Sequence, residues 1–363
     1  MKTVRCILWL PLMLGIIAPG FAQTDPFEAL VKASRVAVLP FANYAEVPAV
    51  MPQIMSLVRA ELRRRGVEQA DSLTVADVLR EHRVRNTNEL TADQIQDLSN
   101  ELAAAYLLVG SLERYVQGDG GAEVALSARL IYVPTTSIEW VGTASRHTLN
   151  GIRLLNLGRE PSAEKLASRA VRDLFRDFRY LRPEHRMRVE SVRVRDGRHF
   201  RRQVCESILT LQFSNETDLF MSGGIVTNRI VAALERFGYS VVEPGRTREA
   251  MLEQGSITPG NASAELLKIC RDHLGVNLLL TGTVSRFDCP STIGIDLIPS
   301  IAIEARLTDV STGYVVWAQT FQSDGRDTNF LFGTGTTYSI TSVADRVAAK
   351  LIKAIPAHRA RKV

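Results

Sequence analysis

The sequence contains few of the residues that build metal centres and disulfide frameworks. Its 363 residues include 4 cysteines and 6 histidines, with no CxxC pair and no HExxH motif. Metal sites need ligands at close helical or hairpin spacing, and disulfide-rich domains need many paired cysteines. We therefore expect no metal, no other cofactor and no disulfide framework. Cys205, Cys270 and Cys289 are either lone or buried thiols, or two of them form one pair.

A strong charge of one sign is also missing. The net charge of +5 falls to +3 when residues 1–22, which hold two basic side chains and no acidic ones, are set aside. Domains that bind nucleic acid usually carry a pronounced basic patch and a larger excess of positive charge, so we expect no nucleic-acid partner. With 45% hydrophobic and 23% charged residues, the chain has the composition of an ordinary globular protein.

Long apolar runs are confined to the N-terminus. Lys2 and Arg5 precede an apolar run over residues 7–18, which ends in small residues up to Ala22. This run is shorter than the roughly 20 residues that cross a bilayer as a helix. The pattern is typical of a signal peptide, so we predict export with cleavage after Ala22, and a retained anchor is the alternative. Cys6 precedes the run, so no lipobox is expected, and the predicted location is the periplasm or the periplasmic face of the outer membrane.

An internal repeat organises the rest of the chain. At an offset of 172 residues, the strand-like residues 36–43 match residues 208–215, and 14 of the 80 positions in 36–115 and 208–287 are identical. The offset becomes 177 after a five-residue insertion, where Arg129 matches Arg306 and Trp140 matches Trp317. The apolar helix face is repeated at Ile54, Val58 and Leu62 and again at Val226, Ile230 and Leu234. Such self-similarity indicates two copies of one structural unit.

The predicted fold class is α/β, with two tandem domains. Each copy follows the order β-α-β-α-α-β-β-β-α and forms a mixed sheet flanked by helices. The last three strands of the first copy are expected at residues 106–115, 124–133 and 138–146, and the closing helices at 163–178 and 343–355. The predicted boundaries are 1–22 for the signal peptide, 23–178 for the first domain, 179–203 for a linker and 204–363 for the second domain.

Several matched residues are predicted to serve packing. Gly110 and Gly282 follow apolar strand residues, which favours close backbone approach or a bulge. Trp140 and Trp317 occupy matched strand positions, so we expect them in the core or on a sheet face. Cys270 matches Leu98 on a helix face, which predicts a core thiol.

Two motifs suggest catalysis or phosphate binding, and we interpret both structurally. Ser162 and Lys165 have the Ser-x-x-Lys spacing of penicillin-recognising enzymes, but no Lys-Thr-Gly follows. We predict that Ser162 opens the closing helix of the first copy, with no match to this motif in the second copy. The glycine- and threonine-rich residues 333–337 lack the lysine of a phosphate-binding loop and are expected to form a flexible loop.

Three segments together carry a resemblance to a known family. They are the Val-Leu-Pro-Phe-Ala-Asn strand at 38–43, the Leu-Leu-Thr-Gly-Thr-Val strand at 279–284 and the Asp-Val-Ser-Thr-Gly-Tyr-Val-Val-Trp turn and strand at 309–317. The pattern resembles the CsgG and LpoB type of bacterial envelope domain. This resemblance implies a domain used for assembly, because relatives activate peptidoglycan synthases, form curli secretion pores, or build flagellar and polysaccharide-export rings. It implies that the chain is not an enzyme.

The expected function is a non-catalytic periplasmic or envelope adaptor that binds other envelope assembly proteins, such as a peptidoglycan synthase or an export complex. The alternatives are a homo-oligomeric ring or secretion-channel subunit and, in third place, a soluble glycan-binding protein. Transmembrane hairpins need strands of about 9 to 11 residues with alternating apolar positions. The loops of this sequence are too short or too mixed in character to provide such hairpins.

The candidate interaction residues lie in the linker and in one loop. Residues 179–203 carry nine arginines against three acidic residues. Arginine suits carboxylates and phosphates, so this stretch could bind anionic glycan, lipid headgroups or an acidic protein surface, and a solvated linker with a charged edge strand is the alternative. In the loop, two phenylalanines either reach a partner or pack under the domain. The candidates are Arg186, Arg188, Arg193, Arg195, Arg201, Arg202, Phe330 and Phe332.

Overall fold

The chain repeats one order of elements in two halves. A computed structural model describes residues 35–118, 121–149, 162–178, 207–253, 263–289, 298–327 and 336–356. We call the described residues up to 178 the N-terminal half and those from 207 onward the C-terminal half. The predicted signal peptide, 1–22, and the Arg-rich linker, 179–203, lie outside the described residues, and the domain boundaries stay predictions.

Most elements of the two halves correspond. The N-terminal half contains β1 (Val36–Val38), β2 (Ala42–Asn43), η1 (Pro48–Val50), α2 (Met51–Arg64), α3 (Ser72–Glu81), α4 (Ala92–Glu101), β3 (Tyr106–Gly118), β4 (Gly121–Tyr132), η2 (Val133–Thr135), β5 (Ser137–His147) and α5 (Ala163–Leu174). The C-terminal half contains β6 (Ser207–Thr210), β7 (Ser214–Asn215), α7 (Ser222–Arg236), β8 (Ser240–Val241), α8 (Pro244–Glu253), α9 (Ala264–Asp272), β9 (Leu278–Asp288), β10 (Ser300–Asp309), β11 (Val315–Asp324) and α10 (Ile340–Ala354). The predicted α/β repeat is confirmed.

Each half forms a mixed sheet. The N-terminal sheet has the order β1-β3-β4-β5, in which β1 lies parallel to β3 and the other pairs are antiparallel. The C-terminal sheet has the order β11-β10-β9-β6-β8, with β6 parallel to both β8 and β9. The strand expected after the first helix is β8, and its N-terminal counterpart is a single bridge between Val36 and Gln69. Residues 36–43 and 208–215 were each predicted as one strand, and the structure divides them into β1 and β2 and into β6 and β7.

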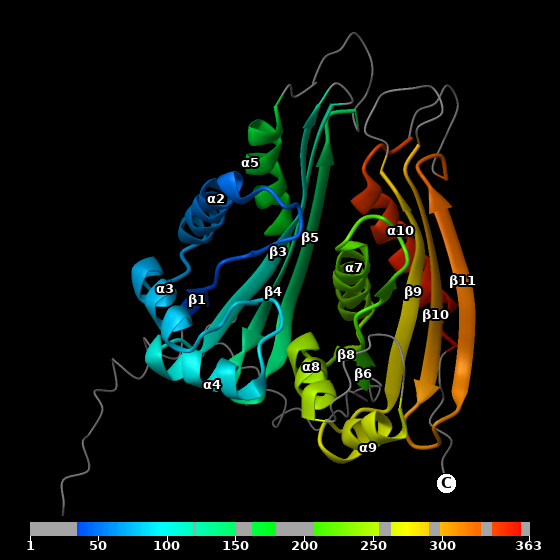
Figure 1. The fold of residues 1–363 in the computed structure, drawn as a ribbon. Coiled ribbons are helices and arrows are strands. Elements are labelled where there is room, and N and C mark those ends of the chain that lie inside the picture. The colour runs from blue at the N-terminus through cyan, green and yellow to red at the C-terminus, as the bar shows by residue number, and fades with distance from the viewer. Residues whose placement is uncertain are drawn as a thin grey trace, which may run out of the picture.

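Helices and sheets alternate in four layers. Figure 1 shows α2 and α5 on one side of the N-terminal sheet, α7 and α10 between the two sheets, and the C-terminal sheet as the last layer. The predicted apolar faces of α2 and α7 are buried in the two main cores. Smaller clusters lie under α3 and α4 and under α8 and α9. Among the described residues, no helix has the length and apolar character needed to cross a membrane.

Side-chain caps fix where several helices begin. Asp71 accepts hydrogen bonds from the backbone N–H groups of Leu73 and Thr74 at the start of α3. Ser162 caps α5, and Ser339 caps α10 in the same way. Such caps satisfy N–H groups that have no partner within the helix. Ser162 therefore begins a helix, as predicted, and Ser339 is the matching cap of α10, although the lysine of the Ser-x-x-Lys motif is not repeated there.

The matched packing residues lie where the sequence placed them. A Cβ atom on Gly110 would lie 2.5 Å from the Ser127 carbonyl oxygen, and one on Gly282 would lie 2.3 Å from that of Glu304. Trp140 is buried and stacks on Phe175 with ring centroids 5.4 Å apart, whereas Trp317 is half-buried. Cys270 is fully buried, as is its counterpart Leu98.

Candidate functional site

The two sheets differ in what covers one of their faces. The face of the N-terminal sheet that lies against α7 and α10 is called the covered face here. It comprises Ser111, Glu113, Ser127, Arg129, Val141, Thr143 and Ser145. The matched residues of the C-terminal sheet are called the open face. They are Thr283, Ser285, Glu304, Arg306, Ala318, Thr320 and Gln322.

Strand pairing shows that the two faces correspond. Ser127 pairs with both Ser111 and Thr143 across the N-terminal sheet. In the C-terminal sheet, Glu304 pairs in the same way with Thr283 and Thr320. Both sheets also carry a β-bulge two residues after these positions, at Glu113 in β3 and at Ser285 in β9. The residue matches derived from the sequence offsets therefore hold in space.

Arg129 joins the covered face to the C-terminal half. Its Nε donates to the two carboxylate oxygens of Glu243 at 3.0 and 2.8 Å, and its Nη1 donates to Oδ1 of Asn88 at 2.8 Å. The side chains of Arg129 and Glu243 are 6% and 0% exposed. Burial lowers the pKa of Arg129, but the attraction of Glu243 outweighs it, so the pKa rises above its ordinary value. The guanidinium keeps its charge and binds the two halves together.

A second buried arginine, Arg229 of α7, points in the opposite direction, from the C-terminal half into the covered face. Its Nε donates to Oε2 of Glu113 at 2.8 Å, and its Nη1 donates to Oδ2 of Asp345 at 3.0 Å. Arg229 and Glu113 have no exposed side-chain surface. Burial lowers the pKa of Arg229, and the attraction of Asp345 and Glu113 raises it by more. Charges this deeply buried require partners, because desolvation without pairing costs several kcal/mol per ion.

Smaller polar contacts surround these two pairs. Arg236 donates to the Thr143 hydroxyl at 2.7 Å, and Asn228 donates to that of Ser111 at 3.1 Å. Near the start of α10, the Ser339 hydroxyl donates to Glu123 at 2.7 Å. Because nearly every polar group of the covered face has a partner in the other half, we conclude that this contact is built like a protein interior.

The lower edge of the covered face adds an apolar contact. Ile138 of β5 is 9% exposed and belongs to the hydrophobic core of the C-terminal half. The preceding residue, Ser137, forms an antiparallel bridge with Val242. The N-terminal sheet thus contributes both a side chain and backbone pairing to its neighbour.

The open face has no corresponding cover among the described residues. Its polar side chains on β10 and β11 are exposed, and exposed Arg306 makes no hydrogen bond or ion pair with any described residue. At the start of β11, Tyr314, Val315 and Val316 are 75%, 57% and 37% exposed. Val315 matches Ile138, which is buried in the N-terminal contact. Three neighbouring exposed apolar residues on an edge strand are typical of an interaction surface.

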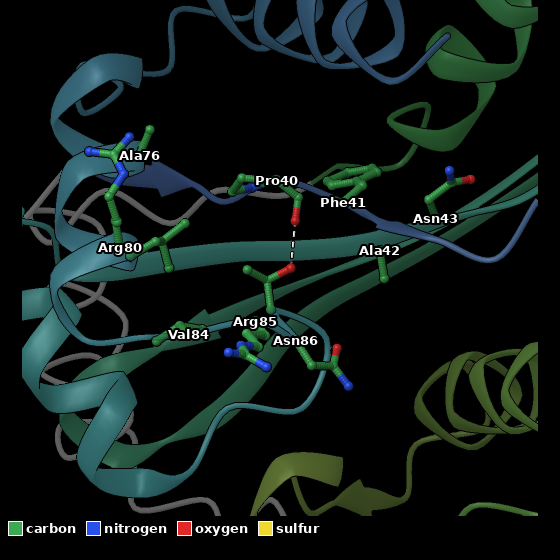
Figure 2. A pocket seen from close by; sticks show the side chains of 11 residues that line it. Pro40, Phe41, Ala42, Asn43, Ala76, Arg80, Val84, Arg85 and Asn86 are labelled. Atoms are coloured by element: carbon green, nitrogen blue, oxygen red, sulfur yellow. Dashed lines mark hydrogen bonds between the residues drawn. The ribbon is translucent and has the colours of Figure 1, made fainter. Parts of the chain in front are cut away.

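A shallow groove lies on the N-terminal half, between residues 40–43, α3 and the loop that follows α3 (Figure 2). Its volume is about 420 Å³. The polar side chains that line it mostly bond within the chain: Thr87 donates to the Pro40 carbonyl at 2.5 Å, and Asn86 donates to Glu89 at 3.1 Å. Arg80, on the rim, pairs with Asp77. Because most of its polar groups already have partners within the chain, the groove offers little specific recognition of a ligand.

The sequence-predicted interaction residues all lie outside the described residues. This holds for the linker arginines at 186, 188, 193, 195, 201 and 202 and for the phenylalanines at 330 and 332. The residues that organise the structure are instead Arg129, Arg229 and their partners, which sequence reasoning did not single out. The match of Arg129 with Arg306 was visible in the repeat, but an isolated arginine on a strand does not reveal whether its face is covered.

The described residues were also searched for catalytic and metal-binding groups. No cluster of three or more histidine, cysteine, aspartate or glutamate side chains that could hold a metal ion occurs among them. Cys270 and Cys289 carry free thiols. Burial raises the pKa of Cys270 to about 11 and that of Cys289 to about 12, so both thiols stay protonated at neutral pH and are poor nucleophiles.

Comparisons with known proteins give similarities to solved structures only. No protein-family model and no curated protein sequence matches the chain. The PelC dodecamer from Paraburkholderia phytofirmans is 22% identical, with 40% of this chain and 87% of that chain covered and a TM-score of 0.26. Lipoprotein GNA1162 from Neisseria meningitidis is 19% identical, with 41% and 99% covered and a TM-score of 0.29.

The LpoB C-terminal domain from Escherichia coli is 17% identical, with 33% and 82% covered and a TM-score of 0.25. LpoB was named by the sequence resemblance, whereas the CsgG part of that resemblance stays a prediction. At these identities and TM-scores the similarities carry no argument about function, and the function of this chain has to be argued from its own geometry.

Proposed function

We propose that this chain is an exported, non-catalytic scaffold of the bacterial cell envelope that binds another polypeptide through the open face. The observation that carries this proposal is the contrast between two matched surfaces. One sheet face is buried under a helical layer with its charges paired, and the equivalent face of the second copy exposes Arg306, Glu304 and the apolar start of β11. The sheet face of the N-terminal copy is covered, so the equivalent face of the C-terminal copy is suited to being covered as well.

The non-catalytic part of the proposal is supported by how the buried charged groups are used. Arg129, Glu243, Arg229 and Glu113 are held in ion pairs across the two halves. Side chains committed to such pairs stabilise the fold and are not free to exchange protons with a substrate. The location in the envelope rests on the signal-peptide pattern of residues 1–22. A peptidoglycan synthase or an export complex remains the proposed class of partner.

Site-specific photo-crosslinking tests the proposal. A photoreactive amino acid in place of the exposed Thr320 should give covalent adducts with a polypeptide in cells that produce the protein, and mass spectrometry identifies the partner. Exposed Lys353 of α10, in the layer between the two sheets, is the control position and should give no such adduct. Equal adduct formation at both positions, or none at Thr320, would contradict binding through the open face.

A further inference from the structure

In the part of the chain that the structure describes, the layered stack ends in two different surfaces that no further layer covers. At one end lies the outer side of the α2 and α5 layer, and at the other lies the open face (Figure 1). The contact between the halves joins a sheet face to the outer side of the α7 and α10 layer, so its two sides differ. A contact between two different surfaces is called heterologous. One surface of each kind stays free at an end of the stack, so the same contact can be repeated between molecules.

The matched residues of the buried Arg129–Glu243 pair are oppositely charged and exposed. Arg306 of the open face matches Arg129, and Asp71 at the start of α3 matches Glu243 at the start of α8. Backbone geometry supports the second match, because the N–H groups of Ala70 and Val242 donate to the carbonyl groups of the matched residues Val36 and Ile208. If a second chain stacked on the open face as the two halves stack on each other, its Asp71 would face Arg306.

The second ion-pair cluster consists of Arg229, Glu113 and Asp345, and none of these three charges is repeated at the matched positions of the free surfaces. Leu57 of α2 takes the place of Arg229, Ser285 takes the place of Glu113, and Ser168 of α5 takes the place of Asp345. Had only one of these charges been kept, stacking would bury an unpaired ion at a cost of several kcal/mol. The three charges are replaced together, so the two free surfaces remain electrostatically compatible.

The residues of the free surfaces that match the smaller polar contacts are also compatible with each other. Arg64 matches Arg236 and Thr320 matches Thr143, so the bond between Arg236 and Thr143 has the same two residue types at the free surfaces. Both Arg64 and Thr320 are exposed. The bond between Asn228 and Ser111 becomes a hydroxyl pair, since Ser56 and Thr283 occupy the matched positions.

The exposed apolar residues fall on the same two surfaces. Val315 matches the buried Ile138, and Tyr314 matches Ser137, whose backbone bridges to Val242. On the other surface, Ala70 matches Val242, and the next turn carries Leu73, which is 75% exposed. Stacking would bring Tyr314 and Val315 next to residues 70–73 and would remove apolar surface from water on both sides.

We propose that the open face binds a second copy of this chain, which stacks head-to-tail with its α2 and α5 layer and its Asp71 over β9, β10 and β11. This inference rests on the proposed function, because it names the partner of the same surface. The contact within the chain is its template, with Arg306 and Asp71 in the places of Arg129 and Glu243. Repetition of this contact produces a ring if the rotation between neighbouring chains closes on itself, and a filament if it does not.

Light scattering over a range of concentrations, combined with charge reversal, tests the inference. The mass of the purified chain should rise with concentration to a multiple of the mass of one chain. Arg306→Glu should weaken self-association by at least roughly tenfold, as expected for loss of a desolvated charge pair. Adding Asp71→Arg to Arg306→Glu should restore it. Lys353→Glu changes the net charge by the same amount at an exposed position of α10, in the layer between the two sheets, and should leave association unchanged.

Disulfide trapping gives a second measurement that does not depend on affinity. Arg64 belongs to α2 and Thr320 to β11, and these two elements lie at opposite ends of the layered stack (Figure 1). A disulfide between Arg64→Cys and Thr320→Cys therefore joins two chains. Oxidation of this double variant should give a ladder of linked chains, and either single variant should not. A chain that is monomeric at every concentration and forms no ladder overturns the inference.

The photo-crosslinks at Thr320 separate failure of this inference from failure of the proposed function. Adducts with peptides of α2 or α5 from the same protein support self-stacking. Adducts with a different protein alone overturn self-stacking and leave the scaffold function standing. Loss of association in Arg306→Glu without rescue by Asp71→Arg overturns the proposed pairing of these two residues.

Discussion

Helices α2 and α7 occupy matched places, yet their surroundings differ. In α2, buried residues are confined to one side, whereas in α7 nearly every residue from Ser222 to Leu234 is buried. The difference arises because α7 lies between two sheets and α2 lies against one (Figure 1). Helix α2 therefore has one contact surface, whereas α7 has two. The residues that distinguish the two helices are the charged residues at the contact between the halves.

The largest effect is expected from removing the arginine that distinguishes the two helices. Arg229→Met leaves Glu113 buried without its cation, so the free energy of unfolding should fall by about 3–5 kcal/mol. Leu57→Met, the same change at the matched position of α2, should cost less than about 1.5 kcal/mol because it conserves volume and removes no charge. Urea unfolding measures both.

A double variant gives the control for this prediction. Adding Glu113→Gln to Arg229→Met removes the stranded charge and should recover part of the loss. Equal losses in Arg229→Met and Leu57→Met would show that the ion pair does not distinguish the two helices.

A second comparison contrasts Arg129 with Arg306. Arg129→Met should lower the free energy of unfolding by about 3 kcal/mol, since Glu243 is fully buried and loses its cation. Arg306→Met changes an exposed side chain and should lower it by no more than about 0.5 kcal/mol in the monomer. The measurement is urea unfolding at a concentration low enough to exclude association. A large effect of Arg306→Met under these conditions would contradict the exposed state of the open face.

The two glycines that face a phenylalanine ring should behave alike in both halves. Gly110→Ala and Gly282→Ala each place a Cβ atom within 2.5 Å of a carbonyl oxygen and within 2.8 Å of the ring of Phe41 or Phe213. Overpacking of this kind should cost about 1–3 kcal/mol in each variant. Gly118→Ala is the control, since a Cβ atom there meets nothing within 4 Å. Thermal unfolding of the three variants checks the prediction.

The smallest expected effect is a pH dependence of stability that arises from one carboxylate of the C-terminal half, Asp309. The pKa of Asp309 is lowered by hydrogen bonds, first from the Ser311 hydroxyl and then from the backbone N–H groups of Thr312 and Ser311. A lowered carboxyl pKa contributes stability above the unfolded value of about 3.9, and this contribution is lost as the pH falls through the folded value. The matched residue of the N-terminal half, Tyr132, has no carboxylate.

Unfolding of the wild type and of Asp309→Asn at several pH values measures this contribution. The wild type should be the more stable at neutral pH, and the difference should shrink below about pH 4. A difference that stays constant down to about pH 2 would contradict the role of the charge.

Much of the fold was predictable because its signals are local. The stripe of Ile54, Val58 and Leu62 has the period of a helix, and its repetition at Val226, Ile230 and Leu234 predicted the second copy. Gly110 and Cys270 were assigned to packing for the same reason, since each lies on an apolar strand or helix face. Helix beginnings were less certain, as Ser339 shows, because a cap depends on one side chain in an unremarkable sequence context.

The candidate site was not predictable in this way. Arg129 and Arg306 have equivalent positions on their strands, so sequence pattern alone cannot tell which is buried. The candidates chosen from composition, the arginines of residues 179–203, stay predictions. Burial of Arg129 depends on Glu243, which is 114 residues away in the sequence, and such a distant partner leaves no periodic signal.

The amino-acid sequence by itself determined the two copies, their helices and strands and the apolar cores within each, because backbone propensity and hydrophobic periodicity act over a few residues. The tertiary structure decided that the second copy stacks its helices on the first copy's sheet and thereby buries one arginine of a matched pair and exposes the other. The physical reason is that burying a charge is favourable only where an opposite charge from the other half meets it.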